Sequence, residues 1–140
     1  MDAEIAAYFA GVIELAQAVF DDVEHTIDST PQRSILRLRA IYGTFRIVVT
    51  ELYSDGARKY RYYLLDGTSV AAGFDNSSDP RALRLRYGTI HRDHVNELIP
   101  HLHLADKTEL VLTDEMRFGD LIQWLDEMSG GNGTIANRNA

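Results

Sequence analysis

The chain has 140 residues, which suits a single domain with a substantial hydrophobic core. It contains no cysteine, and this excludes disulfides, thiolate catalysis and cysteine-ligated zinc. The net charge of −7 argues against general affinity for nucleic acid, because phosphate binding needs lysine and arginine. No apolar run approaches the roughly 20 residues that span a bilayer, and the N-terminus is acidic. We therefore expect a cytoplasmic protein without membrane contact.

The charges are unevenly distributed along the chain. Residues 1–32 carry seven acidic side chains and no basic one, whereas residues 33–92 carry eleven basic and five acidic side chains. Two interpretations stay open for this basic middle. The arginines either face solvent without a partner, or they form one basic surface that meets RNA or an acidic protein segment. The candidates for such a surface are Arg37, Arg39, Arg61, Arg84 and Arg86.

The clearest predicted element is an amphipathic helix over residues 3–27. Its apolar side chains recur at three- and four-residue steps, the spacing of one helical face. They are Ile5, Tyr8, Phe9, Val12, Ile13, Ala16, Val19, Phe20, Val23 and Ile27. Asp2 suits the N-cap position, and Thr30 and Pro31 end the segment because proline cannot continue a helix. We expect the apolar stripe to pack across one face of a sheet.

Residues 34–75 are predicted to form four consecutive antiparallel strands. Alternation of apolar and polar side chains is typical of half-buried strands, and short turns between them require antiparallel pairing. Gly43 permits the first turn, while the Asp55-Gly56 and Asp66-Gly67 pairs are hairpin signals. The predicted strands are residues 34–42, 44–53, 59–65 and 69–75.

The remaining segments complete an α+β domain over residues 1–128, an antiparallel β-sheet meander with an N-terminal amphipathic helix and a C-terminal helix packed on it. Residues 76–80 are a predicted loop, residues 81–87 a strand by their Leu-Arg alternation, and residues 109–112 a short strand. The sequence leaves residues 91–103 ambiguous. Thr113 or Asp114 can cap the closing helix, residues 115–128. Its predicted inner face is Met116, Phe118, Leu121, Ile122, Leu125 and Met128. Residues 129–140 are expected to be a disordered tail.

Four of the five histidines lie within thirteen residues. They are His91, His94, His101 and His103. On a strand, His101 and His103 would share one face, and Asp75, Asp93 or Glu97 could join them as metal ligands. The spacing matches no zinc motif, because a catalytic zinc helix needs histidines four residues apart. Surface or structural histidines are therefore preferred over a metal site.

Three short motifs occur in an order that resembles a known family. Tyr60-Arg61-Tyr62-Tyr63 is followed by Gly73-Phe74-Asp75-Asn76, then by Pro100-His101-Leu102-His103 and a closing helix. This order resembles the TumE-like toxins of type II toxin–antitoxin modules, with their YSYH-type strand, R-Y-D-N motif and P-H-x-H motif. The likeness covers roughly residues 33–128. The chain departs from the pattern at Gly73, where the family has arginine, and at residues 77–80, where Pro-His-His is absent.

The resemblance implies a small toxin that is neutralised by a cognate antitoxin protein and acts on RNA as a metal-independent ribonuclease without a cofactor. The catalytic candidates are Asp75, His101, His103, Arg84 and Arg86; the substrate-binding candidates are Arg37, Arg39, Arg61 and Asn76. In this mechanism the histidines are general acid and base, arginine stabilises the phosphate, and Asp75 orients a histidine. Two alternatives stay open: a non-catalytic binding protein on the same scaffold, and a His/Asp metal-dependent nuclease. A homodimer is also left open.

Overall fold

The computed structural model describes residues 1–89 and 92–130 and shows the expected α+β architecture. Its elements in chain order are α1 (Ala3–Val19), β1 (Asp21–Ser29), β2 (Arg33–Tyr42), β3 (Phe45–Ser54), β4 (Ala57–Asp66), β5 (Ser69–Asp75), α2 (Pro80–Tyr87), the 3-10 helix η1 (Arg92–His94), β6 (His101–Leu104), β7 (Glu109–Leu112) and α3 (Phe118–Gly130). None of the helices in these two ranges has the length and apolar character needed to cross a membrane.

The seven strands form one sheet in which every strand pairs antiparallel with the next one along the chain. The meander predicted for residues 34–75 is confirmed and corresponds to β2–β5. Asp55 and Gly56 have φ values of 52° and 74°, as a two-residue type I′ hairpin turn requires. These short turns fix the register, so each side chain has a defined neighbour on the adjacent strands.

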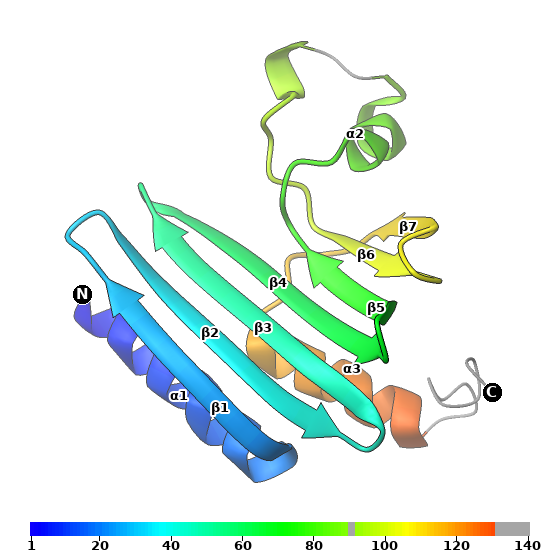
Figure 1. Ribbon diagram of the computed structural model, residues 1–140. Helices are drawn as coiled ribbons and strands as arrows, with labels where there is room; N and C mark the ends of the chain where they lie inside the picture. Colours follow the sequence, from blue (N-terminus) through cyan, green and yellow to red (C-terminus); the bar gives the residue numbers. More distant parts are fainter. Residues whose placement is uncertain (90–91, 131–140) are drawn as a thin grey trace.

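The two faces of the sheet differ in what covers them. Helices α1 and α3 lie side by side on one face, hereafter the covered face, whereas the opposite face of β1–β4 carries no helix of the described chain and is called the open face (Figure 1). The helices contribute Phe9, Val12, Ala16, Phe118, Leu121 and Leu125 to the main core. A second, smaller core joins α2 to the segment before β6 through Ala82, Leu83 and Ile99, with Leu110 of β7 packed against it.

The predicted N-terminal helix is wrong beyond residue 19. Helix α1 ends at Val19, Phe20 is extended, and the chain continues as edge strand β1 from Asp21; Asp22 within this strand adopts a positive φ of 52°. Val23 and Ile27 explain the error. They lie four residues apart, and this spacing places two side chains on one face of a helix and equally on one face of a strand.

The strand predicted for residues 81–87 is also wrong, because this segment is helix α2. Asp79 caps the helix by accepting from the Arg81 N–H at 2.8 Å, proline occupies the first turn, and Gly88 ends the helix with a φ of 80°. Leu83 is 1% exposed and Leu85 is 56% exposed, as expected for residues two positions apart on a helix. The capping signals therefore outweigh the Leu-Arg alternation.

The C-terminal helix begins three residues later than predicted. Neither Thr113 nor Asp114 caps it; instead Asp120 accepts from the Arg117 N–H at 2.8 Å at the start of α3. The predicted inner face is confirmed for its three most buried residues, which are Phe118, Leu121 and Leu125. Of the expected disordered tail, Ser129 and Gly130 belong to α3, and the other ten residues lie outside the described part of the chain.

Candidate functional site

Asp75, His101 and His103 form a compact group, hereafter the Asp–His cluster. Strand β5 ends at Asp75, which pairs in register with His101 of β6, while Gly73 pairs with His103. One ligand-type atom from each of the three side chains lies within 4.8 Å of the others. The exposed fractions of the three residues are 4%, 1% and 4%. The structure thus brings together the three residues that the two separate motifs predicted to be neighbours.

The carbonyl of Ile99 orients the first histidine of the cluster. His101 Nδ1 lies 2.6 Å from the Ile99 oxygen, and a carbonyl can only accept, so Nδ1 carries the proton. His101 Nε2 therefore offers a lone pair, and it lies 3.2 Å from His103 Nε2. His103 Nδ1 is buried without a hydrogen-bond partner among the described residues.

Asp75 is held by groups outside the histidine pair. Its Oδ1 accepts from the Ser77 N–H at 2.6 Å and from the Ser77 hydroxyl, and its Oδ2 lies 3.5 Å from Arg61 Nε. The sequence predicted that Asp75 orients a histidine. In the structure the Ile99 carbonyl orients His101 instead. Ser77 and Arg61 instead hold the carboxylate at the end of β5, beside the imidazoles.

Burial sets the protonation of the second histidine. Desolvation lowers the pKa of His103 to about 4, and the neighbouring His101, Lys107 and Arg81 act in the same direction while Asp75 opposes them. An imidazole with this pKa is neutral at neutral pH. The two histidines of the cluster can therefore lie close together without repulsion between two positive charges.

Basic and aromatic side chains border the Asp–His cluster. The guanidinium of Arg61 lies 5.4 Å from the Tyr63 ring centre, and Lys107 Nζ lies 4.9 Å from the same centre. Tyr63 crosses Gly73 so closely that a Cβ at this glycine would be 2.7 Å from the ring. Arg81 of α2 donates to the Lys107 carbonyl at 2.7 Å. Arg61 was a sequence candidate, and Tyr63 stood in the same motif without a role. Lys107 and Arg81 were missed, because a turn and helix α2 bring them there.

Three other sequence candidates do not join the cluster. Asn76 is 2% exposed; its side chain accepts from the Tyr60 N–H and donates to the Arg58 carbonyl, both at 2.9 Å. Its role is therefore to tie the end of β5 to β4. Arg84 and Arg86 are exposed on α2, where a two-residue separation points them to different sides of the helix. The predicted catalytic role of these two arginines rested on a strand that does not form.

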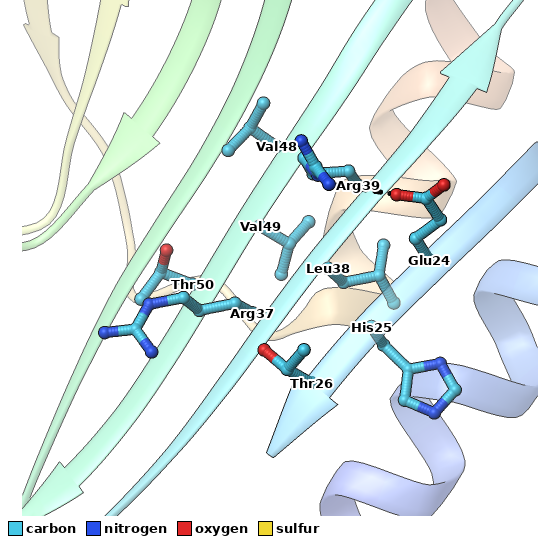
Figure 2. A pocket seen from close by; sticks show the side chains of 9 residues that line it. All are labelled: Glu24, His25, Thr26, Arg37, Leu38, Arg39, Val48, Val49 and Thr50. Atoms are coloured by element: carbon cyan, nitrogen blue, oxygen red, sulfur yellow. Dashed lines mark hydrogen bonds and ion pairs between the residues drawn. The ribbon is translucent and has the colours of Figure 1, made fainter. Parts of the chain in front are cut away.

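Arg37 and Arg39 share the open face with Arg61 but have acidic partners of their own. Figure 2 shows Arg39 directed toward Glu24 across a pocket that Val48 and Thr50 also line; the two charged groups are 2.9 Å apart. Arg37 Nη1 lies 3.4 Å from Asp28. Together with the placement of Arg84 and Arg86 on α2, these pairs mean that the five arginines do not form one unpaired basic surface.

His94 does not join the Asp–His cluster. His94 belongs to η1 and stacks on Tyr87 at 4.0 Å between ring centres, and its Nδ1 lies 4.0 Å from Glu97. His91 falls outside the described residues. The metal-ligand candidates that remain together are therefore Asp75, His101 and His103, without Asp93 or Glu97.

A second buried polar group lies on the covered face and was not expected from the sequence. We call Tyr8, Glu51, Arg58 and Tyr62 the Glu51–Arg58 cluster. Arg58 Nε donates to Glu51 at 2.8 Å, and Tyr8 and Tyr62 each donate their hydroxyl to the same carboxylate. Arg58 also donates to the carbonyl of Met116 at 2.8 Å. These bonds join α1, β3, β4 and the segment before α3.

Comparisons with known proteins found no match: no family model, no curated protein and no solved structure is similar to this chain at a significant level.

Proposed function

We propose that this protein is the toxin of a type II toxin–antitoxin module and that it cleaves RNA at the Asp–His cluster. The observation that carries the proposal is the convergence of Asp75, His101 and His103 from two separate sequence motifs into one group of ligand-type atoms within 4.8 Å. Buried imidazoles and carboxylates that face one another are common at catalytic centres and costly elsewhere.

A phosphodiester would approach from the side of Arg61. The Arg61 side chain is 54% exposed, while its Nε is 3.5 Å from Asp75. The Arg61 guanidinium contacts the ring of Tyr63, and Lys107 contacts the same ring. Two cations beside an aromatic ring suit a backbone phosphate and a stacked base, the combination used for single-stranded nucleic acid. This local positive charge makes RNA binding compatible with a net charge of −7.

The distance between the imidazoles bears on the mechanism. General acid–base cleavage places the base beside the attacking oxygen and the acid beside the leaving oxygen, on opposite sides of the phosphorus. His101 Nε2 and His103 Nε2 are 3.2 Å apart, which leaves no room for a phosphate between them. We therefore favour a joint role for the two histidines on one side of the reacting phosphate over separate acid and base roles.

The test is expression in a bacterial host with and without the neighbouring gene, followed by incubation of the purified full chain with single-stranded and structured RNA. We expect growth arrest that the neighbouring gene relieves, and cleavage that falls by at least about 100-fold in His101→Gln and His103→Gln. His25→Gln is the matched control, because His25 is exposed on β1, far along the sheet from the cluster in strand order.

The same experiment separates the non-catalytic alternative. Growth arrest without RNA cleavage, unchanged by either cluster variant, would favour a binding protein that keeps the scaffold. Loss of activity counts only if circular dichroism and the thermal midpoint show that the variant is folded. Cleavage by both folded variants at the wild-type rate would contradict the proposed site.

A further inference from the structure

We propose that Asp75, His101 and His103 bind one divalent transition-metal ion, of which zinc is the best fit, through one carboxylate oxygen and one ring nitrogen of each histidine. This inference goes beyond RNA cleavage, because a metal site stands whether or not RNA is the substrate. Binding of one ion would also give His101 and His103 a joint role, as their 3.2 Å separation favours. Four features of the cluster support this site.

The first feature is the tautomer of His101. Its Nδ1–H donates to the Ile99 carbonyl at 2.6 Å, which leaves the Nε2 lone pair pointing into the cluster. Metal-binding histidines almost always donate their other ring N–H to a backbone carbonyl or carboxylate, because this contact fixes the ring and makes the bound nitrogen more basic. His101 already has this arrangement.

The second feature is the separation of the nitrogens. His101 Nε2 and His103 Nε2 are 3.2 Å apart. Two nitrogen ligands at 2.0–2.1 Å from a tetrahedral ion lie about 3.3 Å apart. The pair therefore already has the spacing of two ligands of one ion. No backbone movement of β6 is needed, since both residues lie on the same face of that strand.

The third feature is the bonding capacity that the protein leaves unused. His103 is 4% exposed, and its Nδ1 has no hydrogen-bond partner in the described chain. Its other nitrogen, Nε2, has one hydrogen-bond partner among the described residues, His101 Nε2 at 3.2 Å, where one ring nitrogen donates to the lone pair of the other. The ring is therefore held by a single polar contact at Nε2, which a bond to a metal ion can replace.

The fourth feature is the third ligand and its support. Asp75 supplies a carboxylate within 4.8 Å of both rings, and the Ser77 N–H and hydroxyl hold its Oδ1. Outer contacts of this kind keep a metal-binding carboxylate in place. Asp75 Oδ2 lies 3.5 Å from Arg61 Nε, a long contact. A metal ion bound closer to this oxygen can replace the guanidinium.

The ligand set decides the class of ion. Two imidazoles and one carboxylate suit zinc or another first-row divalent ion, whereas magnesium prefers oxygen ligands throughout. Three protein ligands leave a fourth position open, as in zinc sites that promote hydrolysis and unlike closed structural sites. Arg61 borders this group on its solvent side.

The decisive measurement uses the full chain, purified without a polyhistidine tag and stripped of metal by a chelator. Zinc and cobalt are titrated into it by calorimetry, and the bound cobalt is followed by its visible absorption. We expect one zinc per chain and an absorption typical of tetrahedral cobalt. Magnesium at the same concentration should give no heat.

Nitrogen-detected magnetic resonance of the wild-type histidine rings identifies the ligands without any substitution. Zinc should shift the ring signals of His101 and His103 and leave that of His25 unchanged. In His101→Gln and His103→Gln, affinity should fall by more than the roughly 10–100-fold that is typical for loss of an outer contact. The Asp75→Asn substitution should also lower the zinc affinity, and Ser77→Ala should lower it by less.

Two results would overturn the metal site: no change in the His101 and His103 signals at about 1 mM zinc, the limit of weak binding, or stoichiometric binding whose affinity is the same in both histidine variants. Zinc binding without RNA cleavage would leave the metal site standing and remove the proposed function. Cleavage that persists in the metal-free chain would leave the proposed function standing and show that the ion is not needed for it; the titration alone decides whether the metal site exists.

Discussion

The sheet buries two polar clusters on its opposite faces, and they differ in how their members are satisfied. In the Glu51–Arg58 cluster, a carboxylate faces a guanidinium at 2.8 Å, and two tyrosine hydroxyls donate to the same carboxylate. In the Asp–His cluster, two imidazole nitrogens face each other at 3.2 Å. The cation beside this second cluster, Arg61, is half exposed, and its Nε lies 3.5 Å from Asp75.

We interpret the Glu51–Arg58 cluster as structural and the Asp–His cluster as the proposed functional site. Opposite charges with complementary donors and acceptors stabilise each other once they are buried, so the Glu51–Arg58 cluster holds α1 and the start of α3 on the sheet. Even the Arg58 Nη1, which has no hydrogen bond, lies 3.9 Å from Glu115. In the Asp–His cluster the two imidazoles share a single hydrogen bond and carry no opposite charges, so we expect this cluster to stabilise the fold much less. The substitutions below test this contrast.

The largest expected effect is that of Glu51→Ala. It leaves the Arg58 guanidinium buried without its carboxylate, and we expect the free energy of unfolding to fall by about 3–5 kcal/mol. Urea unfolding followed by circular dichroism measures the change. Glu24→Ala removes an exposed carboxylate whose partner Arg39 is equally exposed, and it should cost less than about 1 kcal/mol. Equal costs would mean that the buried pair does not hold the fold.

The next effect is the loss of stability at alkaline pH. Burial raises the pKa of Tyr60, which borders the Glu51–Arg58 cluster, to about 12. Because the folded pKa lies above the unfolded value of about 10, the stabilisation is complete below pH 10 and is lost as pH rises through 12. Urea unfolding across this range should show the decline. Tyr60→Phe should make the decline shallower, and an unchanged slope would contradict the assignment.

A smaller effect is expected from Gly73→Ala beside the Asp–His cluster. The new methyl group would lie 2.7 Å from the Tyr63 ring, and displacing the ring should cost about 1–3 kcal/mol. Because Tyr63 contacts both Arg61 and Lys107, RNA affinity should fall as well. Gly119→Ala is the control, since a Cβ there meets nothing within 4 Å. If both variants unfold at the same urea concentration, the ring contact does not constrain this position.

The smallest change in stability is expected in the Asp–His cluster itself. His101→Gln and His103→Gln, unfolded in the presence of a chelator, should cost about 1 kcal/mol or less. The chelator matters because bound metal would add its own stabilisation to the wild type. A loss as large as that of Glu51→Ala would make the histidines structural, and the contrast between the two clusters would disappear.

Local signals predicted much of the fold correctly. The meander of β2–β5 follows from a period of two and from turn residues such as Asp55 and Gly56, whose preferences depend on adjacent residues only. Two of the errors came from patterns that fit two structures. Val23 and Ile27 suit a helix and a strand equally, and the alternation around Leu83 gave way to the caps at Asp79 and Gly88.

The candidate site was predicted in its members but not in its details. Asp75, His101 and His103 came from two motifs, and antiparallel pairing of β5 with β6 makes them neighbours. The predicted arginines on α2 were lost when that segment proved to be a helix. Lys107 was not predicted, because it reaches Tyr63 from a turn that Asp106 ties to Val70 of β5.

The sequence by itself determined the antiparallel meander and the three members of the Asp–His cluster, because turn chemistry, side-chain period and short motifs act over a few residues. Only the tertiary structure decided which nitrogen of His101 is free, since that depends on the Ile99 carbonyl. It alone revealed that Glu51 and Arg58 are buried together, because charged residues are ordinarily exposed and their burial depends on helices far along the chain. Several contacts in the clusters join segments far apart in the sequence, such as Tyr8 with Glu51, and a local pattern carries no record of them.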